Sequence, residues 1–351
     1  MLEKVSILPK DGNFKVLGIE SSCDETSVAV ISDGKLLSNL ISSQDFHNIY
    51  GGVVPELSSR AHLQILLPLV KKSLQESGIS LNQIDLVCAT AGPGLIGALL
   101  VGLTFAKGLS YSLQKPFVPV NHIEGHIFSG FLMNDKPEFP YLCLVVSGGH
   151  TLLLLVESDT QITKLGSTID DAAGEAFDKI SKLLGLGYPG GPKIQEIAEG
   201  KKNNFVDFPI ARCKNEYDFS FSGLKTSVLR FIQKEYGDAS KISAKDISSI
   251  AASFQYSAVR ALLNNTEKAL NKFNVNSISL VGGVAANKML RSEFEKVASK
   301  YKKNLIIPSL EFCGDNAAMI AYRGLKLHQA GIKYDYDFNA YASLSDYSFI
   351  K

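Results

Sequence analysis

Two stretches of the chain repeat one plan of short strands joined by polar turns. The first stretch begins at Lys15 and reads KVLGIE, the polar turn SSCDET, a second strand, an Asp-Gly turn and a third strand KLLSNL. The plan recurs from Tyr141 as YLCLVV, the turn SGGHT, LLLLVES and QITKLG. Hydrophobic runs separated by turn residues are typical of consecutive antiparallel strands. The repetition therefore predicts an internal duplication.

Helical patterns and further strands complete each copy. Helices are expected over residues 55–77 and 287–299 and from near Asp315, and further strands are expected at IDLVCAT, FVPV, SISLVGG and NLIIP. Strands that alternate with helices predict two α/β lobes, each a mixed sheet flanked by helices, with a central cleft between them. This is the actin-like architecture of the actin, sugar-kinase and Hsp70 group (the ASKHA, RNase H-like fold), in which the hairpin turns bind phosphates. We expect residues 14–139 plus 322–351 to form the N-terminal lobe and residues 140–321 the C-terminal lobe. The polar stretch 199–218 is expected to be a surface loop.

The charges of the chain nearly cancel. Thirty-six Lys and Arg stand against thirty-five Asp and Glu in 351 residues, which gives a formal charge of +1. Such a balance produces no global field that would draw the protein to nucleic acid or anionic lipid. The cationic residues fall into short groups that are expected to be solvated helix surface. An RNA partner would be held locally or with another subunit.

The cysteines and the termini indicate a cytoplasmic location. Five cysteines are widely separated and lack CxxC spacing, which argues against a disulfide framework and a four-thiolate zinc site. The first residues carry neither an apolar core nor any Arg, so no secretory or organellar leader is expected. The longest apolar run, residues 95–106, is too short to cross a bilayer. We expect a soluble protein without a membrane partner.

A pair of histidines in NHIEGHIF is a candidate metal site. His122 and His126 are four residues apart, so on a helix both imidazoles fall on one face. Asp315 is the leading candidate for a third ligand, although an Asp before an apolar helix is also a common N-cap. Two His and one carboxylate would leave positions open for a substrate, and one Fe²⁺ or Zn²⁺ ion would fit. A zincin protease needs Glu directly after the first His, where Ile123 stands, and Glu124 would face away.

Several glycine turns are candidate phosphate or nucleotide contacts. The turn SGGHT, the glycines before Asn287 and the segment LGYPGGP could each let phosphate oxygens approach the main chain. Plain turns and an N-cap at Asn287 explain the same residues without a ligand. Asp178 lies in mid-helix and could accept hydrogen bonds from ribose, whereas Asp170 and Asp171 are expected to cap that helix. Cys23 is expected to be a buried small side chain, since no basic neighbour activates it.

Nine motifs together closely resemble one family. In chain order they are GIESSCDETSVAV, GGVVPELSSRAH, NHIEGH, LVVSGGHT, STIDDAAGEAFDK, LGYPGGP, FSFSGLKT, GGVAANKMLR and FCGDNAAMIAY. They resemble the bacterial and mitochondrial branch of the tRNA N6-adenosine threonylcarbamoyltransferases, from about Lys15 to Tyr322. The resemblance implies transfer of threonylcarbamoyl from threonylcarbamoyl-adenylate to N6 of the adenosine 3′ of the anticodon, in tRNAs reading codons that begin with A. It also implies the actin-like fold.

The resemblance also implies roles for individual residues. His122, His126 and Asp315 would bind the metal ion. The adenylate would be held by eight residues: Val145, Val146, Ser147, Gly148, Gly149, Asp178, Gly191 and Asn287. Archaeal relatives have a tyrosine near the metal where this chain has Val145, and some relatives have an acidic ribose contact where this chain has Gln195. The resemblance assigns neither a fourth protein ligand nor a general base.

The resemblance further implies partners besides tRNA and the adenylate: a non-catalytic paralogue of the same fold and a small P-loop ATPase. Two other interpretations stay open at this point. The first is an actin-like regulatory module that binds nucleotide and whose histidines are structural. The second is a metallopeptidase.

Overall fold

The computed structural model describes residues 13–50, 52–202 and 204–343. Contacts divide these residues into two compact units, the first formed by residues 13–136 with 159–161 and 314–343, and the second by 137–158 and 162–313. The expected second boundary at 321/322 thus lies at 313/314. The reason is that helix α10 (Ala317–Gln329) packs on strands β1 and β2 and helix α3 of the first unit, and Asp315 precedes it there.

The first unit contains a five-stranded sheet in the order β3-β2-β1-β4-β5. Its strands β1 to β3 are antiparallel, whereas β4 pairs parallel to β1 and β5 parallel to β4. The bounds are β1 Lys15–Glu20, β2 Glu25–Ser32, β3 Lys35–Ser43, β4 Leu86–Gly92 and β5 Phe117–Asn121. The predicted three-strand plan is confirmed here, with SSCD forming the first turn.

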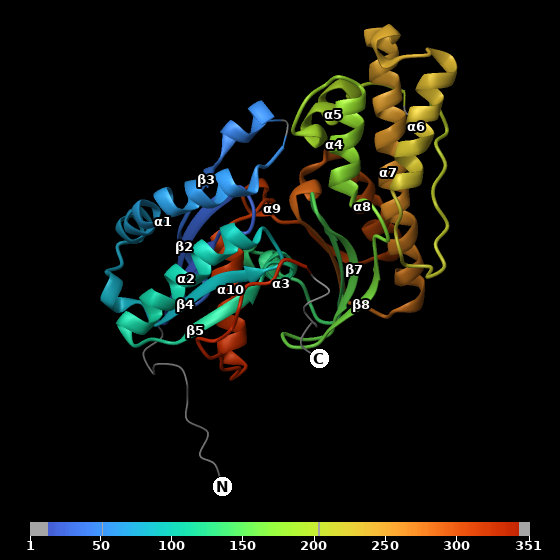
Figure 1. The fold of residues 1–351 in the computed structure, drawn as a ribbon. Helices are drawn as coiled ribbons and strands as arrows, with labels where there is room; N and C mark the ends of the chain where they lie inside the picture. Colours follow the sequence, from blue (N-terminus) through green and yellow to red (C-terminus); the bar gives the residue numbers. More distant parts are fainter. Residues whose placement is uncertain (1–12, 51, 203, 344–351) are drawn as a thin grey trace. The chain divides into compact units, whose positions relative to one another are not determined.

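Helices cover both faces of this sheet (Figure 1). Side chains of Leu17 and Ile19 in β1 belong to one apolar cluster with residues of helices α1 (Pro55–Ser77) and α2 (Ile96–Leu113). The residue between them, Gly18, faces the other way, where a Cβ atom would lie 2.5 Å from the carbonyl oxygen of Ala317 in α10. Successive strand residues point to opposite faces, so β1 is buried on both sides. Helix α3 (His122–Ser129) follows β5 directly.

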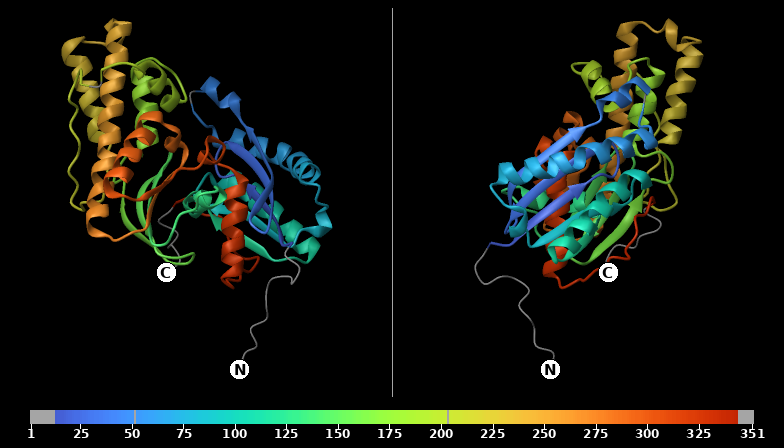
Figure 2. Two further views of the ribbon diagram at one scale, coloured as in Figure 1. Left: turned by 180° about the vertical axis from the view of Figure 1, so that it is seen from behind. Right: turned by 60° about the vertical axis from the view of Figure 1, so that its left-hand side comes forward.

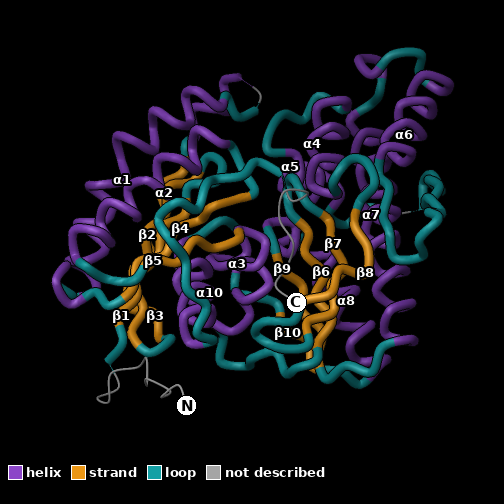
Figure 3. Tube along the Cα trace, turned by 60° about the horizontal axis from the view of Figure 1, so that its bottom comes forward, coloured by secondary structure: helices purple, strands orange, loops and turns teal. Residues whose placement is uncertain are grey.

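The second unit repeats the topology. Its sheet has the order β10-β9-β6-β7-β8, which read backwards matches the first sheet strand for strand. Figure 3 shows the strands of both sheets in orange. The strands are β6 Tyr141–Val146, β7 Thr151–Val156, β8 Ile162–Ser167, β9 Ser277–Val281 and β10 Asn304–Ile306. As in the first unit, the first three are antiparallel and the last two pair parallel to their neighbours. The predicted duplication is confirmed.

Six helices accompany the second sheet in the described part of the chain. They are α4 Ala173–Leu183, α5 Gly190–Ala198, α6 Ser222–Glu235, α7 Ala244–Lys272, α8 Lys288–Tyr301 and α9 Leu310–Cys313. Helices α4 to α7 pack on one another, and α6 lies beside the long helix α7 (Figure 2). Their apolar sides share one core cluster with Leu142, Leu144 and Val146 of β6. The described residues between α5 and α6 form neither helix nor strand, as predicted.

Helix α2 corrects one expectation about the membrane. The apolar stretch continues past Ala106 to Leu113, so the helix has 18 residues and is long and apolar enough to cross a bilayer by length and composition alone. A single such helix is weak evidence, because core helices of folded proteins meet the same criterion. Here α2 packs against β4, β1 and β5 and against α1.

Candidate functional site

Both histidines of NHIEGHIF lie on α3, as the spacing predicts. The helix starts where β5 ends, and the Asn121 side chain caps it by accepting a hydrogen bond from the Glu124 N–H at 3.0 Å. Every residue of α3 is buried. His122 and His126 therefore sit one turn apart on a short helix whose position is fixed by surrounding contacts.

Asp315 completes a three-residue cluster. Its Oδ1 atom lies 3.0 Å from Nε2 of His126 and 3.4 Å from Nε2 of His122. The three ligand atoms lie within 4.8 Å of one another, and the Asp315 side chain keeps 22% of its surface exposed. The alternative interpretation of Asp315 as an N-cap is wrong: Asn316 caps α10, accepting from the Met319 N–H at 3.1 Å. Asp315 is thus left to face the histidines.

Glu20, which the sequence analysis did not single out, orients His122. Its carboxylate is fully buried, and Oε2 lies 3.1 Å from Nδ1 of His122. Thr90 donates to the same oxygen at 2.6 Å, and the Ser22 N–H donates to the other at 2.6 Å. A carboxylate on Nδ1 leaves the Nε2 lone pair for a metal ion. In the sequence, the one sign of this role is that Glu20 ends a hydrophobic strand directly before a polar turn.

The cluster carries an excess of negative charge. Burial lowers the pKa of His122, but the carboxylates of Asp315 and Glu20 outweigh burial and raise it to about 9. Burial raises the pKa of Glu20, but His122 lowers it by more, so the net shift is downward. Burial, Asp315 and Asp24 raise the pKa of Glu25 to about 9. A site that must hold these carboxylates close together favours a cation.

The donor set fits a divalent metal ion. Two imidazole Nε2 atoms and one carboxylate oxygen converge from α3 and from the start of α10. Nδ1 of His126 is buried without a hydrogen-bond partner among the described residues. No hydrogen bond at Nδ1 therefore holds this ring in an orientation that would turn Nε2 away from the cluster. Two His and one carboxylate, with one side partly exposed, are typical of a site that keeps coordination positions open.

Glu124 is directed into the protein rather than toward the histidine cluster. It is fully buried, and its Oε2 lies 2.7 Å from Nε and 2.6 Å from Nη2 of Arg323 in α10. The Arg323 guanidinium also lies over the Phe128 ring and donates to the carbonyl oxygen of Asp159. A carboxylate held in a buried ion pair is not free to act as the general base of a zincin-type protease.

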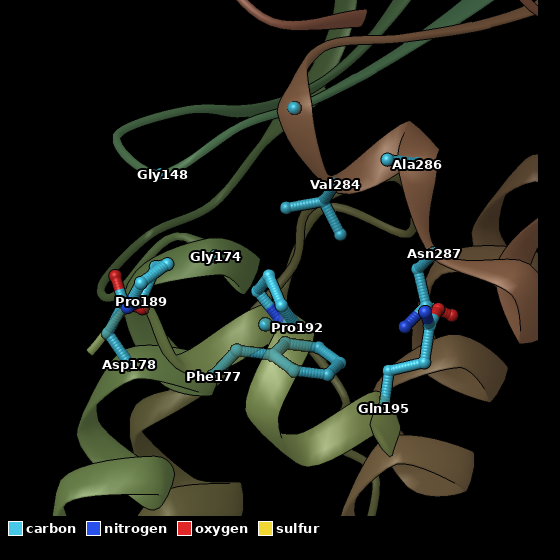
Figure 4. A pocket seen from close by; sticks show the side chains of 12 residues that line it. Gly148, Gly174, Phe177, Asp178, Pro189, Pro192, Gln195, Val284, Ala286 and Asn287 are labelled. Atoms are coloured by element: carbon cyan, nitrogen blue, oxygen red, sulfur yellow. The ribbon is translucent and has the colours of Figure 1, made fainter. Parts of the chain in front are cut away.

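A separate pocket lies in the second unit, with a volume of about 230 Å³ (Figure 4). It lies at the ends of β6 and β9 and at α4 and α5. The lining residues are Gly148, Gly174, Phe177, Asp178, Pro189, Gly191, Pro192, Gln195, Gly283, Val284, Ala286 and Asn287. Four of the eight predicted adenylate residues are among them: Gly148, Asp178, Gly191 and Asn287.

The other four predicted adenylate residues do not line the pocket. Val145 and Val146 are fully buried in β6, and Val146 belongs to the core. Ser147 holds the turn, since its Oγ accepts from the His150 N–H at 3.1 Å and its carbonyl accepts from the Gly174 N–H at 3.2 Å. Gly149 is its neighbour in that turn. Their contact with a ligand stays a prediction.

Three of the glycines that line the pocket leave space that no protein atom fills. A Cβ atom at Gly148, Gly191 or Gly283 would meet no heavy atom of the protein within 4 Å. At Gly174 the same atom would lie 2.6 Å from the carbonyl oxygen of Ser147, so glycine is required for α4 to approach the turn. The first three glycines therefore leave space for a ligand, whereas Gly174 serves packing.

Three polar side chains that line the pocket have hydrogen-bond partners within the protein. Asp178 accepts from the Gly190 N–H at 2.7 Å, and burial raises its pKa. Asn287 caps α8 by accepting from the Leu290 N–H at 3.0 Å, while its amide nitrogen donates to Gln255 at 2.8 Å. Gln195 accepts from the Lys288 N–H at 2.7 Å, which directs its amide nitrogen away from that helix (Figure 4).

The acidic pair before α4 has a different role from the predicted one. The N-cap of α4 is Ala172, which makes no side-chain cap. Asp170 instead accepts from the N–H groups of Phe221 and Ser222 at the start of α6, at 2.8 and 3.2 Å. Asp171 pairs with Lys179 at 2.7 Å and with Lys225 of α6 at 3.3 Å. The motifs STIDDAAGEAFDK and FSFSGLKT are thus joined by these two aspartates.

Cys23 does not qualify as a nucleophile. Burial and the neighbouring Asp24 raise the pKa of its thiol well above the usual range. A protonated thiol is a poor nucleophile. The side chain is partly buried, whereas the sequence predicts a buried one.

Comparisons with known proteins point to one family. The family tRNA N6-adenosine threonylcarbamoyltransferase matches residues 35–322. A protein of that name from Thermosipho africanus is 52% identical over 94% of this chain and 99% of its own length. Another of that name, from Symbiobacterium thermophilum, is 47% identical over 94% of this chain and 96% of its own.

Solved structures share the fold at low sequence identity. HypF from T. kodakarensis superposes with a TM-score of 0.62 and 17% identity over 92% of this chain. The present chain spans about half of that protein, 49% of its length. This likeness supports the two-unit actin-like fold and nothing about activity. The match to the family and the high identity to its members show that the chain belongs to the tRNA N6-adenosine threonylcarbamoyltransferases, enzymes that transfer a threonylcarbamoyl group to N6 of adenosine in tRNA.

Proposed function

We propose that this transferase takes the threonylcarbamoyl group from threonylcarbamoyl-adenylate with the help of one divalent metal ion, Fe²⁺ or Zn²⁺, held by His122, His126 and Asp315. The observation that carries the proposal is the convergence of these three ligand groups within 4.8 Å. When bound, the ion would polarise the carbonyl of the threonylcarbamoyl group. The acceptor is proposed to be the adenosine 3′ of the anticodon in tRNAs that read codons beginning with A.

In the reaction, the adenine N6 amine attacks the carbamoyl carbon of the donor. A C–N bond forms, the C–O bond to the phosphate breaks, AMP leaves, and N6 loses one proton. Glu20 holds Nδ1 of His122, so the ring keeps the orientation that presents Nε2. Asn121 fixes the start of α3 and with it the positions of both histidines. Glu20 and Asn121 thus orient the two histidines, and we assign a proton transfer to neither of them.

The pocket of the second unit is proposed to bind the adenylate part of the donor. The turn at Gly148 would offer main-chain N–H groups to the phosphate, and no side chain there would block the approach. Phe177, Pro192 and Val284 give the pocket apolar walls that suit a purine base. Asp178 would accept a hydrogen bond from a ribose hydroxyl.

We further propose that the protein works in the cytoplasm with a non-catalytic paralogue of the same fold and a small P-loop ATPase, and that tRNA binds well only to the assembly. The formal charge of +1 supports weak tRNA binding by the chain alone. An apolar groove between α1 and α2 supports a protein partner: Leu63, Leu67 and Leu100 line it and are 71%, 49% and 47% exposed. Exposed apolar patches of this kind are typical of protein interfaces.

The test is product formation from synthetic threonylcarbamoyl-adenylate and unmodified tRNA, with the partners present, with and without a chelator. His126→Ala should lose both bound metal and modified adenosine, and chelation should abolish transfer by the unaltered protein. His328→Ala is the matched control, since this histidine stacks on Phe14 far along α10. Near-normal turnover by His126→Ala without bound metal would refute the metal-assisted reaction. A regulatory module or a peptidase would give no modified adenosine at all.

A further inference from the structure

The chain that follows α10 runs back over the first unit as an extended strap, defined here as residues 332–343 (the red segment after α10 in Figure 1). Its backbone pairs with the end of β4, where the Tyr341 N–H donates to the Ala91 carbonyl at 3.0 Å. The Gly94 N–H donates to the Ala342 carbonyl at 3.3 Å.

Side chains fasten the strap to α2 and β5. Tyr336 stacks on Phe117 with 6.2 Å between ring centroids, and its hydroxyl lies 2.9 Å from Oγ of Ser110. Lys107 donates to the carbonyl oxygen of Phe338. Phe338 packs against the core of the first unit. The strap is therefore held at several points along its length.

A further side-chain contact of the strap lies at the start of α3. The Asn121 amide nitrogen donates to the Tyr341 hydroxyl at 2.8 Å, and Asn121 is 2% exposed. The oxygen of the same planar amide accepts from the Glu124 N–H and caps α3. Because the amide is planar, holding its nitrogen also fixes its oxygen. His122 follows directly after Asn121.

Gly92 allows this close approach. It is paired with Asn121 across β4 and β5. A Cβ atom at Gly92 would lie 2.2 Å from the Tyr341 carbonyl oxygen and 2.8 Å from its ring, and the φ of +147° also disfavours other residues. Any larger side chain would push the strap away from the N-cap. Glycine at position 92 thus leaves the space that Tyr341 occupies.

From this geometry we infer that Tyr341 is a positioning residue, which holds the N-cap of α3 and thereby sets the geometry of the metal ligands His122 and His126. The inference rests on the metal site proposed above. Tyr341 acts through Asn121 and touches neither ligand nor substrate in this role. Losing the hydroxyl should loosen the first turn of α3 and weaken metal binding, while the ring and the strap stay in place.

The experiment compares Tyr341→Phe, Tyr336→Phe and His126→Ala in the full chain. Zn²⁺ affinity is measured by competition with a chromogenic chelator, and hydrogen exchange by mass spectrometry of peptides spanning residues 121–129. Substitutions around metal ligands typically cost about 10–100-fold in affinity, and for this more remote residue we expect a loss of about three- to tenfold. Exchange at 121–129 should be faster. Tyr336→Phe loses a hydroxyl contact of the same strap and should leave both quantities unchanged.

Two further readouts separate positioning from general stability. Saturating Zn²⁺ should restore kcat of Tyr341→Phe, and KM for the adenylate should not change. Asn121→Ser keeps a capping oxygen but loses the donor to Tyr341, so it should reproduce the weaker Zn²⁺ binding even where Tyr341→Phe melts early. If His126→Ala loses Zn²⁺ while both variants bind it as the unaltered protein does, the inference about Tyr341 is wrong. If His126→Ala also keeps Zn²⁺, the metal site itself is wrong.

Discussion

Glu20 Oε2 lies 3.1 Å from His122 Nδ1, and both side chains are buried. This contact joins the end of β1 to the start of α3, two segments about a hundred residues apart. It fixes the imidazole ring in the orientation that directs Nε2 toward Asp315. It also connects the strand before the first polar turn of the sequence to the cluster of His122, His126 and Asp315.

Glu20→Gln should weaken metal binding by about 10–100-fold, as expected for the carboxylate that orients a ligating histidine. Glutamine can still accept at one position, but its NH2 group would face another donor, either the Ser22 N–H or the Nδ1–H of His122. Zn²⁺ titration against a competing chelator measures the loss. Glu56→Gln is the control, because Glu56 lies on the surface of α1 and pairs with Arg60. Equal Zn²⁺ affinity in both variants would contradict the role of Glu20.

Gly148→Ala should weaken an unreactive adenylate analogue at least about tenfold, or about 1.4 kcal/mol. The new methyl group would meet no protein atom, so it points into open space at the pocket and the melting temperature should stay near that of the unaltered protein. Gly149→Ala, in the same turn, is expected to act in the same direction. Gly223→Ala is the control, since its Cβ is equally free but lies outside the pocket. Normal binding by Gly148→Ala would place the phosphate elsewhere.

Asn287→Ala should mainly lower stability. The side chain caps α8 and bonds Gln255, and loss of an N-cap typically costs about 1 kcal/mol. Adenylate affinity should fall by less than in Gly148→Ala, because a neutral hydrogen bond contributes about 0.5–1.5 kcal/mol. Chemical denaturation and analogue binding, measured on the same preparation, separate the two effects. A variant that is fully stable but fails to bind would reverse this assignment.

Asp171→Asn should remove a pH-dependent part of the stability. Burial raises the pKa of Asp171, but Lys179 and Lys225 outweigh burial, so the folded pKa lies below the ordinary value of 3.8. The ion pairs therefore stabilise the fold above about pH 4 and are lost as the pH falls through the folded pKa. The unfolding free energies of the two proteins should differ by at most about 1 kcal/mol at neutral pH and converge in acid. A difference that is the same at neutral and acid pH would contradict this role of the ion pairs.

Leu63→Ser combined with Leu100→Ser should abolish binding of the proposed paralogue while barely changing stability. Both side chains line the exposed groove between α1 and α2 rather than the core. Analytical ultracentrifugation with the paralogue measures the association. Leu229→Ser, on α6 of the second unit and 38% exposed, is the control. An unchanged complex would move the interface away from this groove, and tight tRNA binding by the chain alone would contradict the need for partners.

Local sequence signals determined the elements and their duplication. Alternating apolar runs and Asp-Gly-type turns predicted the three-strand plan twice, and both copies form antiparallel strands at the expected places. The helix predicted over residues 55–77 has those bounds, because Pro55 starts it and Gly78 ends it. The spacing of His122 and His126 placed both rings on one helix face. These features depend on neighbours within a few residues, which the sequence displays directly.

Tertiary structure alone decided which distant groups meet. The sequence allowed Asp315 to be the N-cap of α10, but Asn316 is the N-cap in the structure. Asp170 caps α6 rather than α4. Glu20 reaches His122 only because β1 and β5 flank β4 in the sheet. Tyr341 reaches Asn121 only because Gly92 leaves the space. A side chain can satisfy the same hydrogen-bonding need with several partners, and strand order and packing select one of them. The sequence therefore determined which groups are available for the proposed metal site, and the fold determined which of them come together there.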